Sequence, residues 1–131
     1  MILLDTHVWL WWMYNSPEMP KGLLYALDKN KEDGFAVSVI SCWEVSKLLQ
    51  KKRIEIDCSL TDWFNRNAYA PFIHLVDLTP EIIAEAAALP SFPNKDPADQ
   101  LIVATARDKG FTLATYDRKL SQYPHVALLA Y

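Results

Sequence analysis

Four acidic residues lie where short apolar segments end or where the following helices are expected to begin. They come from four separate parts of the chain: Asp5, Glu44, Asp99 and Asp117. Asp5 ends the apolar segment ILLD, and Asp117 directly follows the segment TLATY. A carboxylate at the end of a buried strand costs free energy unless a partner compensates its charge. The chemistry of these acids therefore depends on whether the fold brings them together.

A cluster of these carboxylates would require a cation. Two carboxylates about 4 Å apart repel each other by roughly 4 kcal/mol at an effective dielectric constant near 20. Some members would take up protons unless a cation compensates them, and oxygen-only ligands suit Mg²⁺ or Mn²⁺. Such ions polarise a phosphodiester and activate water. The acids therefore predict metal-dependent hydrolysis, and three glycines are too few for a phosphate-binding glycine loop.

Each acid also has a simpler structural explanation. The spacing of Ser41 and Glu44 is that of a capping box, in which the glutamate bonds back to the cap residue. Asp96 directly precedes a proline, so we expect it to be the structural member of the pair that it forms with Asp99. Asp117 could cap the turn that follows it. The coincidence of all these acids at one edge favours a functional site.

The elements that must position the acids alternate between strands and helices. Strands are expected at residues 2–5, 35–40, 72–78, 112–116 and 126–130. Helices, with their caps, are expected at about 7–13, 16–29, 41–52, 61–69, 79–89, 96–110 and 117–123. This alternation predicts a three-layer α/β/α sandwich with a central, mainly parallel sheet. Open parallel sheets bind ligands beyond the carboxyl ends of their strands, which is where the acids fall.

Length and composition predict a single domain over residues 1–131. Cys42 and Cys58 have neither disulfide-framework nor zinc-site spacing, which favours a reducing compartment, and we expect the cytoplasm. The first segment carries Asp5 and lacks a basic start, which argues against a signal peptide. No apolar run approaches the roughly 18 residues of a membrane helix. The net charge of −3 does not favour binding nucleic acid by charge alone, so positive charge must come from metal ions or a local patch.

With the acids in place, the sequence resembles the PIN domain, specifically the VapC-type toxin ribonucleases of toxin–antitoxin pairs. The resemblance rests on LLDTHVWLWW, SCWEVSKL, DPADQLIVATA and LATYD, which occur in the family's order and cover essentially the whole chain. It implies an endoribonuclease that cleaves single-stranded RNA, uses Mg²⁺ or Mn²⁺ and usually forms a homodimer. It also implies a small VapB-like antitoxin whose C-terminal segment covers the acidic groove.

The resemblance also assigns roles to individual residues. It implies that the metal ligands or water-activating acids are Asp5, Glu44, Asp99 and Asp117, with Asp96 as a metal-binding accessory. Thr6 and Thr115 fall where the family often has hydroxyls that support the acids. The sequence departs from the commonest pattern at His7 and Tyr116, and neither change removes an acid.

Two other functions remain open from the sequence. A phosphorylation-switched receiver domain is also a Mg²⁺-binding α/β sandwich, but it needs a second acid beside Asp5, where Thr6 stands. Asp77 is its only candidate phosphoacceptor, and a poor one. A catalytically silent binding module with the same fold is the other alternative.

Two further groups of residues have functional and structural explanations. Trp9, Trp11 and Trp12 could stack on RNA bases, but burial of Trp9 and Trp12 on one helical face is favoured. A basic cluster could contact phosphates or could complement a helix C-terminus; it contains Lys47, Lys51, Lys52 and Arg53. By position, Arg118 is the better candidate for a phosphate contact.

Overall fold

Four short parallel strands form the centre of the computed structural model, which describes residues 1–131. They are β1 (Ile2–Leu4), β2 (Phe35–Ser38), β3 (Ile73–Val76) and β4 (Thr112–Ala114). The sheet has the order β3-β2-β1-β4, and every neighbouring pair is parallel. Leu4 at the end of β1 lies opposite Ala114 at the end of β4. The carboxyl ends of β1 and β4 therefore meet at one edge of the sheet.

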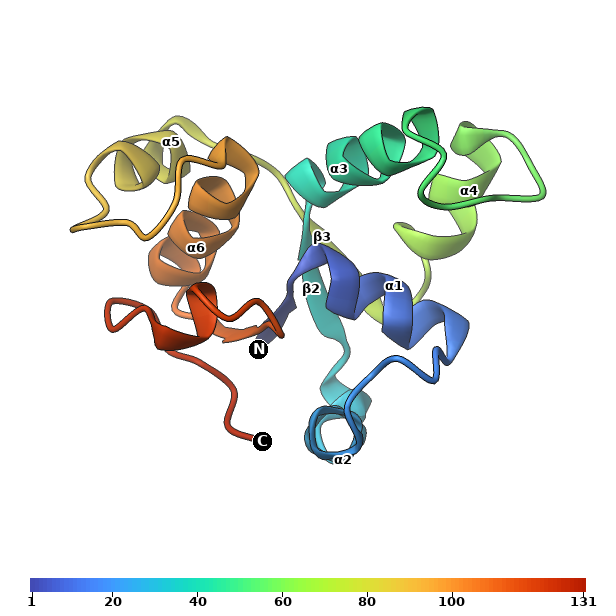
Figure 1. The fold of residues 1–131 in the computed structure, drawn as a ribbon, viewed down its shortest axis with the longest axis horizontal. Helices are drawn as coiled ribbons and strands as arrows, with labels where there is room; N and C mark the ends of the chain where they lie inside the picture. The colour runs from blue at the N-terminus through green and yellow to red at the C-terminus, as the bar shows by residue number, and fades with distance from the viewer.

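Helices cover both faces of this sheet (Figure 1). One face packs against α1 (Thr6–Tyr14), α2 (Lys21–Asp28), α3 (Val39–Gln50) and α4 (Leu60–Asn67). The other packs against α6 (Pro97–Lys109), which lies beside α5 (Pro80–Ala87). Two 3₁₀ turns complete the fold: η1 (Lys31–Asp33) and η2 (Leu120–Gln122). The predicted three-layer sandwich with a mainly parallel sheet is confirmed, since all its pairings are parallel.

Alternating strand residues supply two separate cores. On β1, Ile2 and Leu4 face the core beneath α1, α2 and α4, whereas Leu3 faces the core beneath α6. The first core is built around Trp9 and Trp63, whose rings meet edge to face with centroids 5.2 Å apart. Because β1 is buried on both faces, its position is fixed by packing on two sides.

The predicted end of strand 35–40 and start of the next helix are wrong. The strand ends at Ser38, whose hydroxyl accepts a hydrogen bond from Ile40 N (3.2 Å) and caps α3. Helix α3 therefore begins at Val39, and Ser41 and Glu44 do not form a capping box. The β-branched Val39 and Ile40 favour a strand by intrinsic propensity. Packing of Ile40 against the second core outweighs this preference.

Three other segments also differ from the prediction. Helix α2 begins at Lys21 rather than after Ser16, because Pro20 disfavours helical backbone at the preceding residue. The segment 126–130 is not a full strand and forms a single bridge between Leu113 and Leu128. The expected helix 117–123 is reduced to the 3₁₀ turn η2. No helix has the length and apolar character needed to cross a membrane.

Candidate active site

The first part of the site lies where β1 and β4 end side by side. Asp5 follows β1 and caps α1, and its backbone N–H donates to Ala114 O (2.9 Å). Thr115 Oγ1 donates to Asp5 Oδ2 (2.7 Å) and accepts a hydrogen bond from Asp117 N (3.0 Å). The Asp117 carboxylate accepts from Leu120 N (3.0 Å), so it also has the capping role considered from the sequence. One hydroxyl thus holds two acids near the same edge.

The second part joins α1 to α3. Thr6 Oγ1 donates to Glu44 Oε1 (2.5 Å) and lies 2.8 Å from the hydroxyl of Ser41. Ser41 is fully buried, and it lies one helical turn before Glu44 on the same face of α3. Both threonines that the sequence singled out therefore bond to acids, and Ser41 supports one of them.

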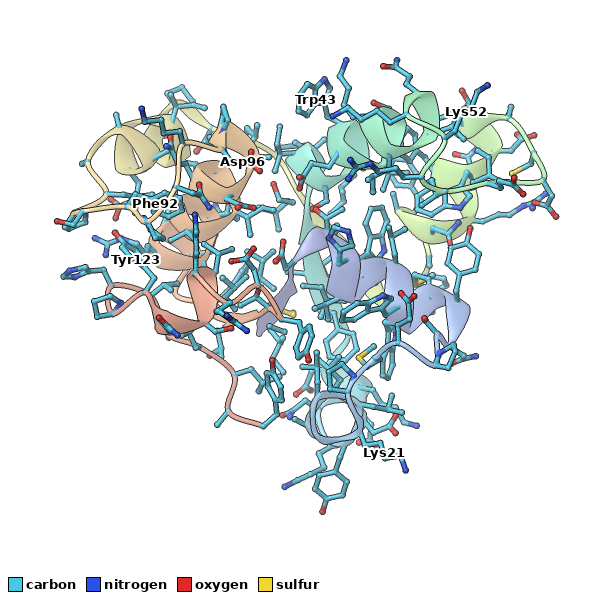
Figure 2. The ribbon with its side chains drawn as sticks, in the orientation of Figure 1. Lys21, Trp43, Lys52, Phe92, Asp96 and Tyr123 are labelled. Atoms are coloured by element: carbon cyan, nitrogen blue, oxygen red, sulfur yellow. The ribbon has the colours of Figure 1, made fainter.

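The third part is the start of α6. Asp96 caps this helix, because its Oδ1 accepts from Ala98 N (2.9 Å), as its position before a proline predicted. Asn94 links the two acids: its Nδ2 donates to Asp99 Oδ2 and its Oδ1 accepts from Asp96 N, both at 2.9 Å. Figure 2 shows Asp96 at the end of α6 that is nearer to α3.

These three parts enclose one pocket of about 340 Å³. Its lining contains all five acids together with other polar and aromatic residues: Asp5, Thr6, His7, Trp11, Glu44, Asp96, Asp99, Tyr116 and Asp117. We call it the carboxylate pocket. Carboxylate oxygens of Glu44, Asp96 and Asp99 lie within 4.8 Å of one another, and Asp5 and Asp117 line the same pocket outside this closest group. The structure thus brings together every acid singled out from the sequence.

The electrostatics of the pocket show an excess of negative charge. Burial, together with the charges of Asp5 and Asp96, raises the pKa of Asp99 to about 7. Burial also raises the pKa of Glu44 to about 6, although the hydrogen bond from Thr6 opposes this rise. The pKa of Asp5 is raised by burial too. No lysine or arginine lines the pocket, and His7 is the one basic side chain among its five acids.

This donor set fits a hard divalent cation. The closest group offers only carboxylate oxygens, and neither cysteine lines the pocket. Oxygen ligands of this kind are preferred by Mg²⁺, Mn²⁺ and Ca²⁺, whereas thiolates favour softer metals. A bound cation would also lower the raised pKa values, because it stabilises the charged form of each carboxylate.

Without divalent cations, we expect the free energy of unfolding to fall as the pH rises from about 4 to about 7. Asp99 and Glu44 regain ordinary pKa values of 3.8 and 4.5 on unfolding, but stay protonated to higher pH when folded. The folded state therefore binds more protons in this range and loses stability as they dissociate. Solvent screens these half-buried groups, so we expect a loss of about 1–2 kcal/mol. Urea unfolding in EDTA measures it, and a rising stability would contradict it.

Several neighbours of the acids were not predicted as site residues. Ser41 was interpreted only as a helix cap, and Asn94 was given no role. Trp11 lines the pocket and meets Tyr116 edge to face at 5.8 Å, whereas Trp9 is fully buried as expected. The Ser41–Glu44 spacing already placed both residues on one helical face, which was a usable signal.

Arg118, the better phosphate-contact candidate by position, does not line the carboxylate pocket. It is exposed and lies next to Asp117 in the chain, outside the residues that line the carboxylate pocket. Its contact with phosphate therefore stays a prediction from position alone.

Known proteins are similar to this chain in sequence and in fold. The PIN domain family matches residues 2–126. Ribonuclease VapC22 of Mycobacterium tuberculosis is 36% identical over 124 residues, which cover 95% of this chain and 92% of that protein. VapBC2 from Rickettsia felis, solved with a DNA fragment from its promoter, aligns with a TM-score of 0.69 at 17% identity, covering 98% of this chain and 97% of that one. FitAcB from Neisseria gonorrhoeae aligns with a TM-score of 0.66 at 21% identity, covering 99% and 97%. The predicted resemblance is confirmed, and the chain belongs to the PIN domain family.

Proposed function

We propose that this protein is a metal-dependent endoribonuclease that cleaves single-stranded RNA and is the toxin of a toxin–antitoxin pair. The observation that carries the proposal is the convergence of five acids from four separate segments in one pocket. The 36% identical relative is a ribonuclease, and it aligns over nearly the whole chain. Structural neighbours include a toxin–antitoxin complex from Klebsiella pneumoniae.

The acids would hold Mg²⁺ or Mn²⁺, with Asp5, Glu44, Asp99 and Asp117 as ligands and Asp96 as an accessory. When bound, such a cation polarises the phosphodiester and makes the attacking water more acidic. The protein's part is to position the acids. Thr115 fixes Asp5 through its 2.7 Å hydrogen bond, and Asn94 orients Asp99.

Glu44 is suited to accept a proton from the attacking water. Its Oε1 accepts a hydrogen bond from the hydroxyl of Thr6, whereas no protein group donates to its Oε2. A general base must lie within hydrogen-bond reach of the water, and Glu44 belongs to the closest group of acids, with Asp96 and Asp99. The proton acceptor and the cation-binding acids then lie in one cavity.

Partners and location follow from the same proposal. The neighbours are VapBC and other toxin–antitoxin assemblies, which supports a small VapB-like antitoxin for this chain as well. Its C-terminal segment would cover the carboxylate pocket, where an arginine could replace the charge of the cation. We propose a homodimer that acts in the cytoplasm. Co-expression with the gene product encoded beside this one, followed by purification of a complex, tests the antitoxin.

Chelation provides the direct test of metal dependence. Purified protein should cut an unstructured RNA oligonucleotide in Mg²⁺ or Mn²⁺, and EDTA should stop the cleavage because the carboxylates cannot replace the Lewis acid. Excess Mg²⁺ added back should restore it, as seen on a denaturing gel. Cleavage that persists in EDTA would remove the metal from the mechanism.

The two alternatives considered from the sequence can also be judged. A receiver domain is not supported, because Asp77 is exposed, follows the edge strand β3 and lies outside the carboxylate pocket. A silent binding module would keep the fold without hydrolysing RNA. If calorimetry detects Mn²⁺ binding but no RNA is cut under any metal, the silent module replaces the enzyme.

A further inference from the structure

A second pocket of about 380 Å³ adjoins the carboxylate pocket along α3. The two cavities share part of their lining, namely Thr6, His7, Glu44 and Asp96. The remaining walls come from α3 and the turn after it, namely Trp43, Lys47, Leu48, Lys51 and Arg53. We call this second cavity the cationic groove. Because Glu44 lies on its border, a ligand in the groove extends directly to the acids.

The charge of this groove is opposite to that of its neighbour. Lys47, Lys51 and Arg53 line it, whereas no lysine or arginine lines the carboxylate pocket. The three ion pairs of the chain all involve other residues, so none of these cations is held in an ion pair, and they outnumber the two acids, Glu44 and Asp96, that line the same groove. Complementing the end of α3 can account for Lys47 and Lys51, but Arg53 lies beyond the helix. The groove thus has free positive charge where an anion would approach the acids.

An exposed tryptophan completes the groove. Trp43, Lys47 and Lys51 follow one another at intervals of four residues, which places them along one side of α3 and its C-cap. The side chain of Trp43 is 54% exposed, and Nζ of Lys47 lies 5.1 Å from its ring centroid. Figure 2 shows Trp43 on the outer surface of α3, away from the sheet. An aromatic platform beside cations is the arrangement by which proteins hold unpaired nucleotides.

We propose that the cationic groove binds the stretch of single-stranded RNA next to the scissile phosphodiester, with Lys47, Lys51 and Arg53 on phosphates and Trp43 stacked on a base. This inference rests on the proposed ribonuclease function and adds the path of the substrate. A polyanion is repelled by five carboxylates, and the net charge of −3 gives no general attraction. The groove supplies that attraction beside the acids. An acidic protein segment bound in the groove would pair with the cations, but it would not account for the exposed ring of Trp43.

The test measures RNA binding separately from cleavage. Fluorescence anisotropy with a labelled, unstructured RNA oligonucleotide is carried out in EDTA between about 50 and 200 mM KCl. The double variant Lys47→Gln/Lys51→Gln should reduce the slope of log K against log [KCl] by about 1.4, since each lost single-strand contact contributes about 0.7. Lys52→Gln is the matched control, because Lys52 is exposed on the same turn but lies outside the groove.

Trp43 is tested by a graded pair of variants. Trp43→Ala should weaken RNA binding roughly 5- to 150-fold, the usual range for loss of one base-stacking side chain, and Trp43→Phe should retain most of the affinity. The same variants should raise KM for cleavage in Mg²⁺ and leave Mn²⁺ binding by calorimetry unchanged. Equal losses in the Ala and Phe variants would contradict stacking.

The possible outcomes separate this inference from the proposed function. In one outcome, the unchanged protein cleaves RNA, but the groove variants change neither the RNA affinity nor the salt slope. This result would overturn RNA binding in the groove and keep the ribonuclease function; the cations would then bind an acidic protein segment. RNA binding that depends on the groove without any cleavage would support the groove and overturn the enzyme. If the unchanged protein neither binds nor cleaves RNA, both the groove proposal and the proposed ribonuclease function are overturned.

Discussion

Replacing Asp99 by asparagine will abolish RNA cleavage and at the same time stabilise the metal-free protein. Burial, together with the charges of Asp5 and Asp96, raises the pKa of Asp99 to about 7. Asparagine keeps its shape but removes a charge that the proposed cation site requires. We expect the cleavage rate to fall by at least about 10³-fold, comparable to the loss of a principal charge-stabilising group. The opposite sign of the two effects distinguishes a functional acid from a structural one.

Two measurements on the same variant check this expectation. Single-turnover cleavage of an RNA oligonucleotide in Mg²⁺ gives the rate, and urea unfolding in EDTA at neutral pH gives the stability. Asp77→Asn is the matched control, because Asp77 is exposed and outside the carboxylate pocket. It should change neither quantity. If Asp99→Asn cleaves RNA at the unchanged rate, the pocket is not the active site.

The second large effect concerns the core that positions the site. Trp9→Ala should destabilise the protein by about 3–5 kcal/mol, the usual range for truncating a large buried aromatic side chain. Trp9 is fully buried on α1, the helix that carries Asp5 at its cap and Thr6 in its first turn. Its ring packs edge to face against Trp63. Losing this contact removes the support of α1 on the sheet.

The matched variant Trp9→Phe separates the contribution of the ring contacts from the cost of the buried indole N–H. Trp9 Nε1 is buried with no hydrogen-bond acceptor among the protein atoms, and such an unpaired donor costs about 1–3 kcal/mol. Phenylalanine loses apolar contact but also removes this donor, so we expect a net change within about 1.5 kcal/mol. Urea denaturation of both variants gives the comparison. A destabilisation by Phe as large as that by Ala would contradict this expectation, because Phe keeps most of the ring contact and both variants remove the N–H.

The convergence of the acids was predictable because it depends on strand order and helix starts. Asp5 and Asp117 follow strands, and Asp99 follows a cap and a proline, so local patterns placed all three at the carboxyl edge. Glu44 was predicted at the correct edge of the sheet, but the predicted start of its helix was wrong. Its helix starts three residues earlier than the pattern indicated, so it lies in the second turn and bonds to Thr6.

The features that could not be predicted depend on tertiary packing. The start of α3 reflects the partial burial of Ile40 against the second core and the cap at Ser38, and the first of these does not follow from local propensity. The segment 126–130 alternates like a strand, but its pairing to Leu113 is limited to one bridge. Asn94 reaches Asp99 only because the loop before α6 folds back on that helix. The basic cluster was visible in the sequence, but its continuity with the acids depends on where α3 lies.

The bond between Asp5 and Thr115 has a consequence for synthesis in the cell. The two residues are 110 positions apart, and β1 gains its neighbour β4 only when the last part of the chain is available. Closing so long a loop is entropically costly and makes folding slower. A chain still growing on the ribosome therefore lacks the hydroxyl that fixes its first acid. The carboxylate pocket can therefore be completed only when almost the whole chain has been translated.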